Sequence, residues 1–88
     1  MKIKIEITKE DIEGATRRDV ENCPIARALQ RHGFEGAVVS VPRFELGPRY
    51  IATKRRTLPR TLVDEALRFD DGKTFRPCEF YLHFEDFA

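Results

Sequence analysis

Apolar and charged positions alternate strictly at the start of the chain. Three isoleucines in residues 3–7 are separated by lysine and glutamate, which is the period of a strand with one buried face. The hydroxyl of Thr8 can cap the N–H groups of a following helix, and Asp11 suits the positive end of that helix. The pattern therefore predicts a strand and then a short helix that Gly14 ends in a left-handed turn.

A second helix is predicted from the Cys23-Pro24 pair onwards. Proline fits the first helical position because its missing N–H is not needed there, so Cys23 becomes the N-cap. Apolar residues then recur at i, i+3 and i+4, and His32 stands at i+7. Gly33 ends this predicted helix, and Phe34 can fold back on it.

The middle of the chain alternates again but changes phase once. The inward apolar positions are odd in residues 37–41 and even in residues 44–46. Pro42 stands at the change, which predicts a bulge or an edge position there. A Gly-Pro turn at residues 47–48 then predicts a hairpin whose returning strand covers residues 50–53.

The last third combines a helical stripe with a final strand. Leu62, Ala66 and Leu67 follow helical spacing after Pro59 in the first turn, and the Asp-Asp-Gly of residues 70–72 stops the helix. Alternation with period two then returns. The elements run in the order β-α-α-β-β-α-β, which is typical of the α+β class.

These patterns predict one domain over residues 1–88, because a second core would not fit in so short a chain. Strands with one polar face fit a sheet that is covered on one side only. We expect a single four-stranded, mostly antiparallel sheet with helices on one face. The residues expected to be buried there are Ile5, Ile25, Leu29, Val39, Leu62, Ala66, Phe80 and Leu82.

Composition narrows the possible environments and cofactors. No stretch approaches the roughly 18–20 apolar residues that span a bilayer, and the start lacks the apolar run of a secretory signal, so we expect a cytoplasmic protein. Cys23 and Cys78 are too few for a disulfide scaffold. With His32 and His83 they make four zinc-ligand side chains, but no two lie at finger spacing. We therefore expect reduced thiols and no metal or other cofactor.

Cys23 is the strongest candidate for covalent chemistry. A helix N-terminus, with Arg17 and Arg18 nearby in sequence, would favour its thiolate. A nucleophile also needs a base, and His32 lies near the far end of the same helix, which leaves His83. Phosphate-loop, G-x-S-x-G and H-E-x-x-H motifs are all missing. A packed or capping cysteine is the preferred interpretation, and we predict that the chain is not an enzyme.

Charge is segregated along the chain although the total is only +1. Residues 1–16 carry a net charge of −1, residues 17–60 of +6, and residues 61–88 of −4. Nine of the ten bases in the middle are arginines, which suit bidentate recognition of phosphate or carboxylate. The candidate binding residues on the predicted hairpin and its exit are Arg43, Arg49, Tyr50, Lys54, Arg55, Arg56 and Arg60. Alternatively, this surface is solvated and partly paired with the acidic C-terminal helix.

Three segments together carry a family resemblance: I-T-K-E-D-I at 7–12, N-C-P-I-A-R-A-L at 22–29, and R-F-D-D-G-K followed by P-C-E-F within 68–80. The combination resembles small uncharacterised proteins encoded by bacteriophages, prophages and some bacteria. The resemblance covers most of the chain and implies a genomic setting, without a chemistry. The basic stretch at Lys54-Arg55-Arg56 departs from the shorter connection of such proteins.

The sequence thus favours a non-enzymatic, phage-type accessory protein that binds a host or phage macromolecule, with counter-defence as one role. Surfaces of opposite sign suit steered association with a protein and also allow a homo-oligomer. The alternative is a nucleic acid or a nucleotide bound by the Arg-rich hairpin, with Tyr50 as a stacking surface. A pI near 7.8 is low for a dedicated nucleic-acid module. The third hypothesis is a thiol-dependent enzyme that uses Cys23.

Overall fold

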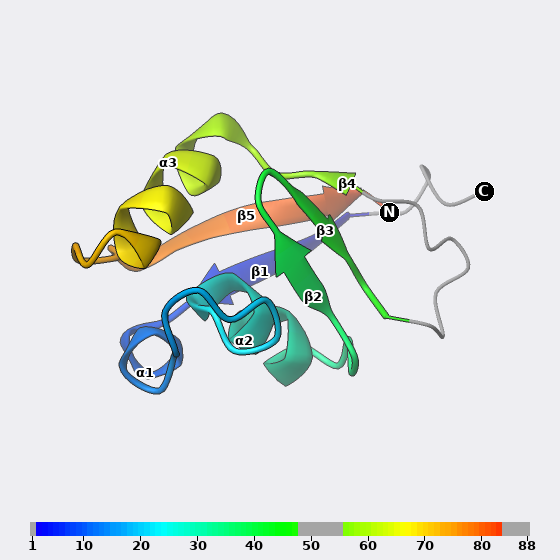
Figure 1. The fold of residues 1–88 in the computed structure, drawn as a ribbon. Coiled ribbons are helices and arrows are strands. Elements are labelled where there is room, and N and C mark those ends of the chain that lie inside the picture. Colours follow the sequence, from blue (N-terminus) through cyan, green and yellow to red (C-terminus); the bar gives the residue numbers. More distant parts are fainter. Residues whose placement is uncertain (1, 48–55, 84–88) are drawn as a thin grey trace.

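The computed structural model describes residues 2–47 and 56–83, which form an α+β fold as expected (Figure 1). The described elements, in chain order, are β1 (Lys2–Ile7), α1 (Lys9–Glu13), α2 (Pro24–Arg31), β2 (Val38–Ser40), β3 (Arg43–Glu45), β4 (Arg56–Thr57), α3 (Arg60–Asp70) and β5 (Cys78–His83). None of these helices is long and apolar enough to cross a membrane.

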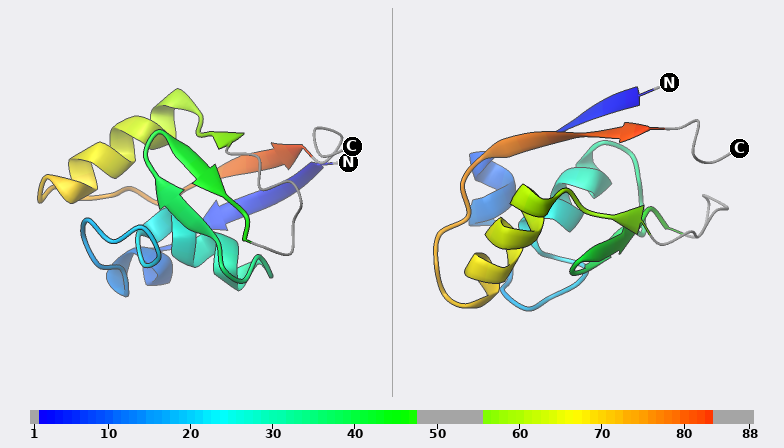
Figure 2. Two further views of the ribbon diagram at one scale, coloured as in Figure 1. Left: turned by 45° about the vertical axis from the view of Figure 1, so that its right-hand side comes forward. Right: turned by 90° about the horizontal axis from the view of Figure 1, so that it is seen from above.

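The strands form two small antiparallel sheets, so the prediction of a single four-stranded sheet was wrong. β1 pairs with β5, and β2, β3 and β4 form the second sheet in that order. Seen from above, β1 and β5 make one layer, and the helices and the second sheet lie on one side of it (Figure 2, right). The two sheets meet through side chains, because Phe44 of β3 contacts Phe80 of β5 edge to face, with ring centroids 6.0 Å apart. Apolar packing therefore links strands that the sequence analysis had joined by hydrogen bonds.

The chain reverses at Pro42, where the sequence analysis expected a bulge or an edge. β2 and β3 are joined by a two-residue turn that contains a cis Val41–Pro42 peptide, as in type VI turns. An odd residue pairs with an even one across such a turn, and Val39 lies opposite Phe44. The change of phase therefore marked a hairpin. The returning strand predicted at residues 50–53 lies outside the described residues.

Local sequence signals explain most helix ends. Thr8 and Asp11 form a reciprocal capping box at the start of α1. After α2, Gly33 adopts a φ of +102°, and the Phe34 N–H donates to the Leu29 carbonyl at 3.0 Å, which closes a Schellman motif.

Two predictions about helix ends were wrong. Gly14 is right-handed, with a φ of −87°, so it does not provide a left-handed stop. A Cβ there would collide with the guanidinium of Arg27, so the glycine makes room for that side chain. Pro59 is itself the N-cap of α3, although it was expected in the first turn, and no side chain caps that helix.

The core lies between the two layers. All eight residues expected to be buried are at most 6% exposed, from Ile5 at 0% to Ala66 at 6%. Phe34, Phe69 and Phe75 join the same apolar cluster. The outer face of the β1–β5 sheet is polar, and Lys4 forms ion pairs there with Glu6 and Glu79.

Candidate functional site

An apolar cleft of about 300 Å³ opens between the start of α2, the strand β2 and the helix α3. Ile25 and Phe75, both part of the core, contribute to its lining. Val20 and Leu67 also line it and are 46% and 54% exposed. Among the described residues, only these two and Tyr81 are large apolar side chains left exposed. The polar residues of the cleft are Arg18, Asp19, Ser40 and Asp70.

Arg17 fastens the loop of residues 15–22 to the end of α3. Its guanidinium donates to the carbonyl of Phe69 and, at 2.9 Å, to that of Lys73. The same guanidinium lies 4.3 Å from the centroid of the Phe69 ring. Carbonyl groups at a helix C-terminus carry partial negative charge and favour a cation there. Arg17 is therefore a structural residue at the base of the cleft wall.

Arg18 and Val20 fix the same loop against both walls of the cleft. Arg18 has a φ of +61°, which is unusual for a side chain of its size. Its N–H donates to the Asp70 carboxylate at 2.8 Å, and its Nε donates to the Asp70 carbonyl at 3.2 Å. The Val20 carbonyl accepts from the N–H of Val39 in β2 at 2.8 Å. These bonds place the exposed Val20 side chain opposite α3.

Cys23 lies within the cleft lining and is the N-cap of α2, as predicted. Its Sγ accepts from the Ala26 N–H at 3.4 Å. Burial raises the pKa of the thiol and outweighs the backbone N–H groups, which lower it. The preferred interpretation, a packed and capping cysteine, is confirmed. The effects expected to favour the thiolate do not prevail, because the helix start is desolvated and Arg17 and Arg18 bind the end of α3.

No described histidine supplies a base to this thiol. His32 caps the far end of α2, and its Nε2 accepts from the Glu6 N–H at 3.3 Å. The side chain of His83 lies outside the described structure. Nor do three or more His, Cys, Asp or Glu side chains gather as a metal site anywhere in the described part of the chain.

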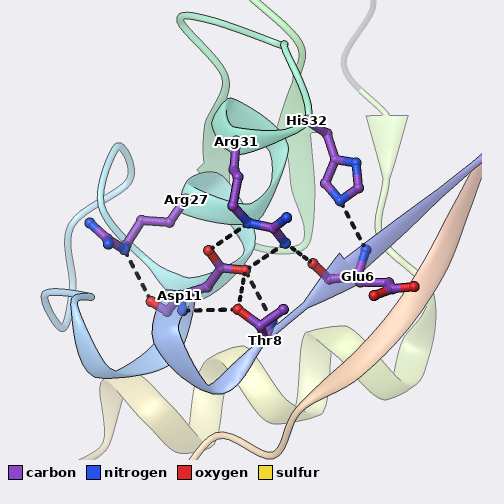
Figure 3. Close-up of polar contacts among 6 residues, drawn as sticks. All are labelled: Glu6, Thr8, Asp11, Arg27, Arg31 and His32. Atoms are coloured by element: carbon purple, nitrogen blue, oxygen red, sulfur yellow. Dashed lines mark hydrogen bonds and ion pairs between the residues drawn. The ribbon is translucent and has the colours of Figure 1, made fainter.

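A second polar cluster joins α1 to α2 through Asp11 (Figure 3). The Asp11 side chain is 5% exposed and accepts two hydrogen bonds from Arg31, at 3.2 and 3.1 Å. It also accepts from the N–H and hydroxyl groups of Thr8, at 3.0 and 3.1 Å. Burial alone would raise the pKa of this carboxyl, but Arg31 and Thr8 outweigh it and lower the pKa. Both carboxylate oxygens have partners, so the cluster is a structural joint.

The neighbours of Asp11 extend this joint to β1. Arg31 also donates to the Glu6 carbonyl at 2.7 Å, and Arg27 donates to the Asp11 carbonyl at 3.1 Å. Within the described part of the chain, four of the ten central bases donate hydrogen bonds to other groups of the protein, namely Arg17, Arg18, Arg27 and Arg31. The sequence alone gave no sign that these arginines are structural.

The predicted basic site falls only partly within the described residues. Pairing of β3 with β4 places the Arg43–Phe44 dipeptide beside Arg56–Thr57, so two of its arginines come from adjacent strands. Arg60 begins α3, is 89% exposed in its side chain and lies 3.8 Å from Asp64. The other candidates lie outside the described ranges, namely Arg49, Tyr50, Lys54 and Arg55.

The cleft was not predicted from the sequence. Leu67 was expected in the apolar stripe of α3, whereas the buried side of that helix contains Leu62, Ala66 and Phe69. The available signal was Val20, an apolar residue in an otherwise polar loop. No family model, curated protein or solved structure matches this chain.

Proposed function

We propose that this protein is a non-enzymatic binding module that docks a protein partner through the apolar cleft. The observation that carries the proposal is the pair of exposed side chains, Val20 and Leu67, on a cleft lined by core residues. Covering exposed apolar surface is favourable by about 25 cal/mol per Å². An apolar centre with a polar rim is also the usual anatomy of a protein interface.

The occupant that fits best is an apolar anchor side chain of the partner. A volume of about 300 Å³ lies at the lower end of small-molecule sites, which span roughly 300–1,000 Å³. Arg18 and Asp70 at the cleft offer one charge of each sign to the polar groups that flank such an anchor. The resemblance to phage and prophage proteins indicates that a bacterial host is the source in which to seek the partner.

Replacing Leu67 by aspartate should abolish capture of that partner. A carboxylate at this position would be desolvated on docking, and loss of a central apolar contact typically costs about 2 kcal/mol or more, which is about 30-fold in affinity. The measurement compares proteins retained from host lysate by immobilised wild type and by Leu67→Asp. A photo-crosslinking residue at position 67 should attach covalently to the same protein.

Thr61→Asp is the matched control, because it adds the same charge to an exposed position of α3 outside the cleft. It should retain the partner fully. Equal retention by Leu67→Asp, or equal loss from Thr61→Asp, would show that the cleft is not the docking site. Circular dichroism and a thermal melt establish that each variant is folded.

A second candidate function is binding of a nucleic acid or a nucleotide. This candidate is favoured by the positions of the basic residues that are not part of the structural contacts described above. The six central bases other than those four arginines all fall within residues 43–60, which contain a single acid, Glu45, and carry a net charge of +5. Arg43 and Arg56 lie on adjacent strands. Arginine side chains suit phosphate groups, and residues 43–60 contain five of them.

Salt dependence distinguishes this candidate from protein docking. Affinity for duplex DNA should fall with a log–log slope of about −0.9 per phosphate neutralised, and about −0.7 for single strands. Changing Arg55 and Arg56 to alanine should flatten that slope by about one to two units. Lys9→Ala, an exposed base on α1, should leave it unchanged. Absence of binding to DNA, RNA and nucleotides at about 50 mM salt would eliminate this candidate.

A further inference from the structure

On the outer edge of β5, backbone groups point away from the sheet. In β1, the Glu6 N–H and carbonyl bond to His32 and Arg31, at 3.3 and 2.7 Å, so they face away from β5. Backbone direction alternates along paired antiparallel strands, and Glu6 lies opposite Glu79. The backbone groups of Glu79, and of Tyr81 two residues on, therefore face away from β1. No described residue pairs with them.

The two edges of this sheet differ in the features that would block pairing with another strand. The β1 edge has lysines at positions 2 and 4, and its remaining outward groups, on Glu6, are occupied. Sheets use such devices to block pairing with another chain. The six residues of β5 contain neither lysine nor proline, and β5 pairs with β1 without a bulge. Figure 1 shows β5 above β1, and in the view from above β5 passes in front of β1 (Figure 2, right).

We propose that β5 pairs with β5 of a second copy of this chain. The strands run antiparallel about a two-fold axis at Tyr81, which makes a continuous sheet in the order β1-β5-β5-β1. This register brings the largest number of outward-facing backbone groups of β5 into hydrogen bonding. A two-fold axis needs a surface that is complementary to itself, and this edge meets that condition.

The side chains of the edge agree with this register. Tyr81 lies opposite its copy, and cross-strand aromatic pairs are favourable in sheets. The Tyr81 side chain is exposed, and the Lys2 ammonium lies 5.0 Å from its ring centroid. Glu79 lies opposite position 83 of the second copy, whereas an axis at Glu79 would oppose two like charges. Phe80 lies opposite Leu82, which extends the apolar inner layer from one copy to the other.

Analytical ultracentrifugation over a range of concentrations tests the proposal. The wild type should reach twice the chain mass, and Tyr81→Lys should remain at the chain mass with an unchanged circular dichroism spectrum. That substitution keeps the strand but opposes two ammonium groups at the axis. Thr74→Lys, which adds the same charge at an exposed position outside β5, should dimerise like the wild type. A monomeric wild type, or equal dimerisation of Tyr81→Lys, would overturn the proposal.

Cross-linking provides a test that does not depend on the lysine variant folding. Directly opposed residues in a hydrogen-bonded antiparallel pair have Cα atoms about 5.5 Å apart, within the usual range for a disulfide. Tyr81→Cys should therefore form a covalent dimer under mild oxidation. Thr74→Cys should not. Equal cross-linking of the two variants would refute the axis at Tyr81. The effect of Leu67→Asp on partner capture is measured separately, so it does not depend on the outcome of the cross-linking.

Discussion

Replacing Leu29 by alanine should lower the free energy of unfolding by about 2–5 kcal/mol. Leu29 lies on the buried side of α2 and has no solvent exposure. The substitution removes apolar contacts and leaves a cavity that the surrounding core fills only in part. The total stability of a domain this small is itself about 4–13 kcal/mol, so the change is a large fraction of it. Urea denaturation followed by circular dichroism measures the difference.

Leu67→Ala is the control for this substitution, because it makes the same chemical change at a side chain that is 54% exposed. It should shift the midpoint far less. Ile25→Val, at another fully buried position of α2, should cost about 0.5–1.5 kcal/mol and remain folded if Leu29→Ala does not. Equal midpoints for Leu29→Ala and Leu67→Ala would show that the buried side of α2 is misassigned.

Replacing Asp11 should destabilise the protein in a way that depends on pH. Asp11→Asn removes charge-assisted bonds to Arg31 and Thr8, and bonds to charged groups contribute about 1.5–3 kcal/mol. The lower end is expected, about 1.5–2 kcal/mol, because the Arg31 side chain is 47% exposed and water can solvate it. Asp11→Ala also removes the return half of the capping box, for a total of about 2–3 kcal/mol.

The pH dependence follows from the lowered pKa of Asp11 in the folded protein. The folded chain holds this carboxyl ionised more strongly than the unfolded chain does. The stabilisation is therefore complete above the ordinary aspartate pKa of about 3.9 and is lost as the pH falls through the lower folded value. Wild type and Asp11→Asn should thus differ at pH 6 and converge in acid. Asp64→Asn, in the exposed pair with Arg60, should melt with the wild type throughout, and a constant gap for Asp11→Asn would contradict the assignment.

Most features that depend on neighbouring residues were predictable from the sequence, although the expected roles of Gly14 and Pro59 at helix ends were wrong. The Thr8 cap, the Cys23-Pro24 helix start and the Gly33 stop each require contacts within a few residues, and all three are present. The eight core residues named from the sequence were also predictable, because the apolar face of a periodic segment is buried whichever element packs against it. Sheet pairing was not predictable, since Phe44 and Phe80 meet by packing between layers and local pattern does not distinguish this from strand pairing.

The candidate cleft depends on three segments that are distant in sequence. The loop with Val20 meets the helix α3 where Arg17 and Arg18 bind the end of that helix, and it meets the strand β2 through the Val20 carbonyl. In the sequence these two arginines count only toward the charge of the basic middle. The change of phase around Pro42 was a local signal that was interpreted from the sequence as a bulge or an edge, whereas it marks a two-residue hairpin.

The pairing of β1 with β5 also sets when the fold can be completed during protein synthesis. Ile5 is synthesised well before Phe80, its partner across the sheet. At about 5–20 residues per second, synthesis of the chain between them takes about 4–15 s. Until then β1 can pack on α2 but has no strand beside it. A nascent chain therefore presents an unpaired apolar strand to chaperones for most of its translation. A chain cut before Cys78 would therefore leave β1 permanently without its partner strand.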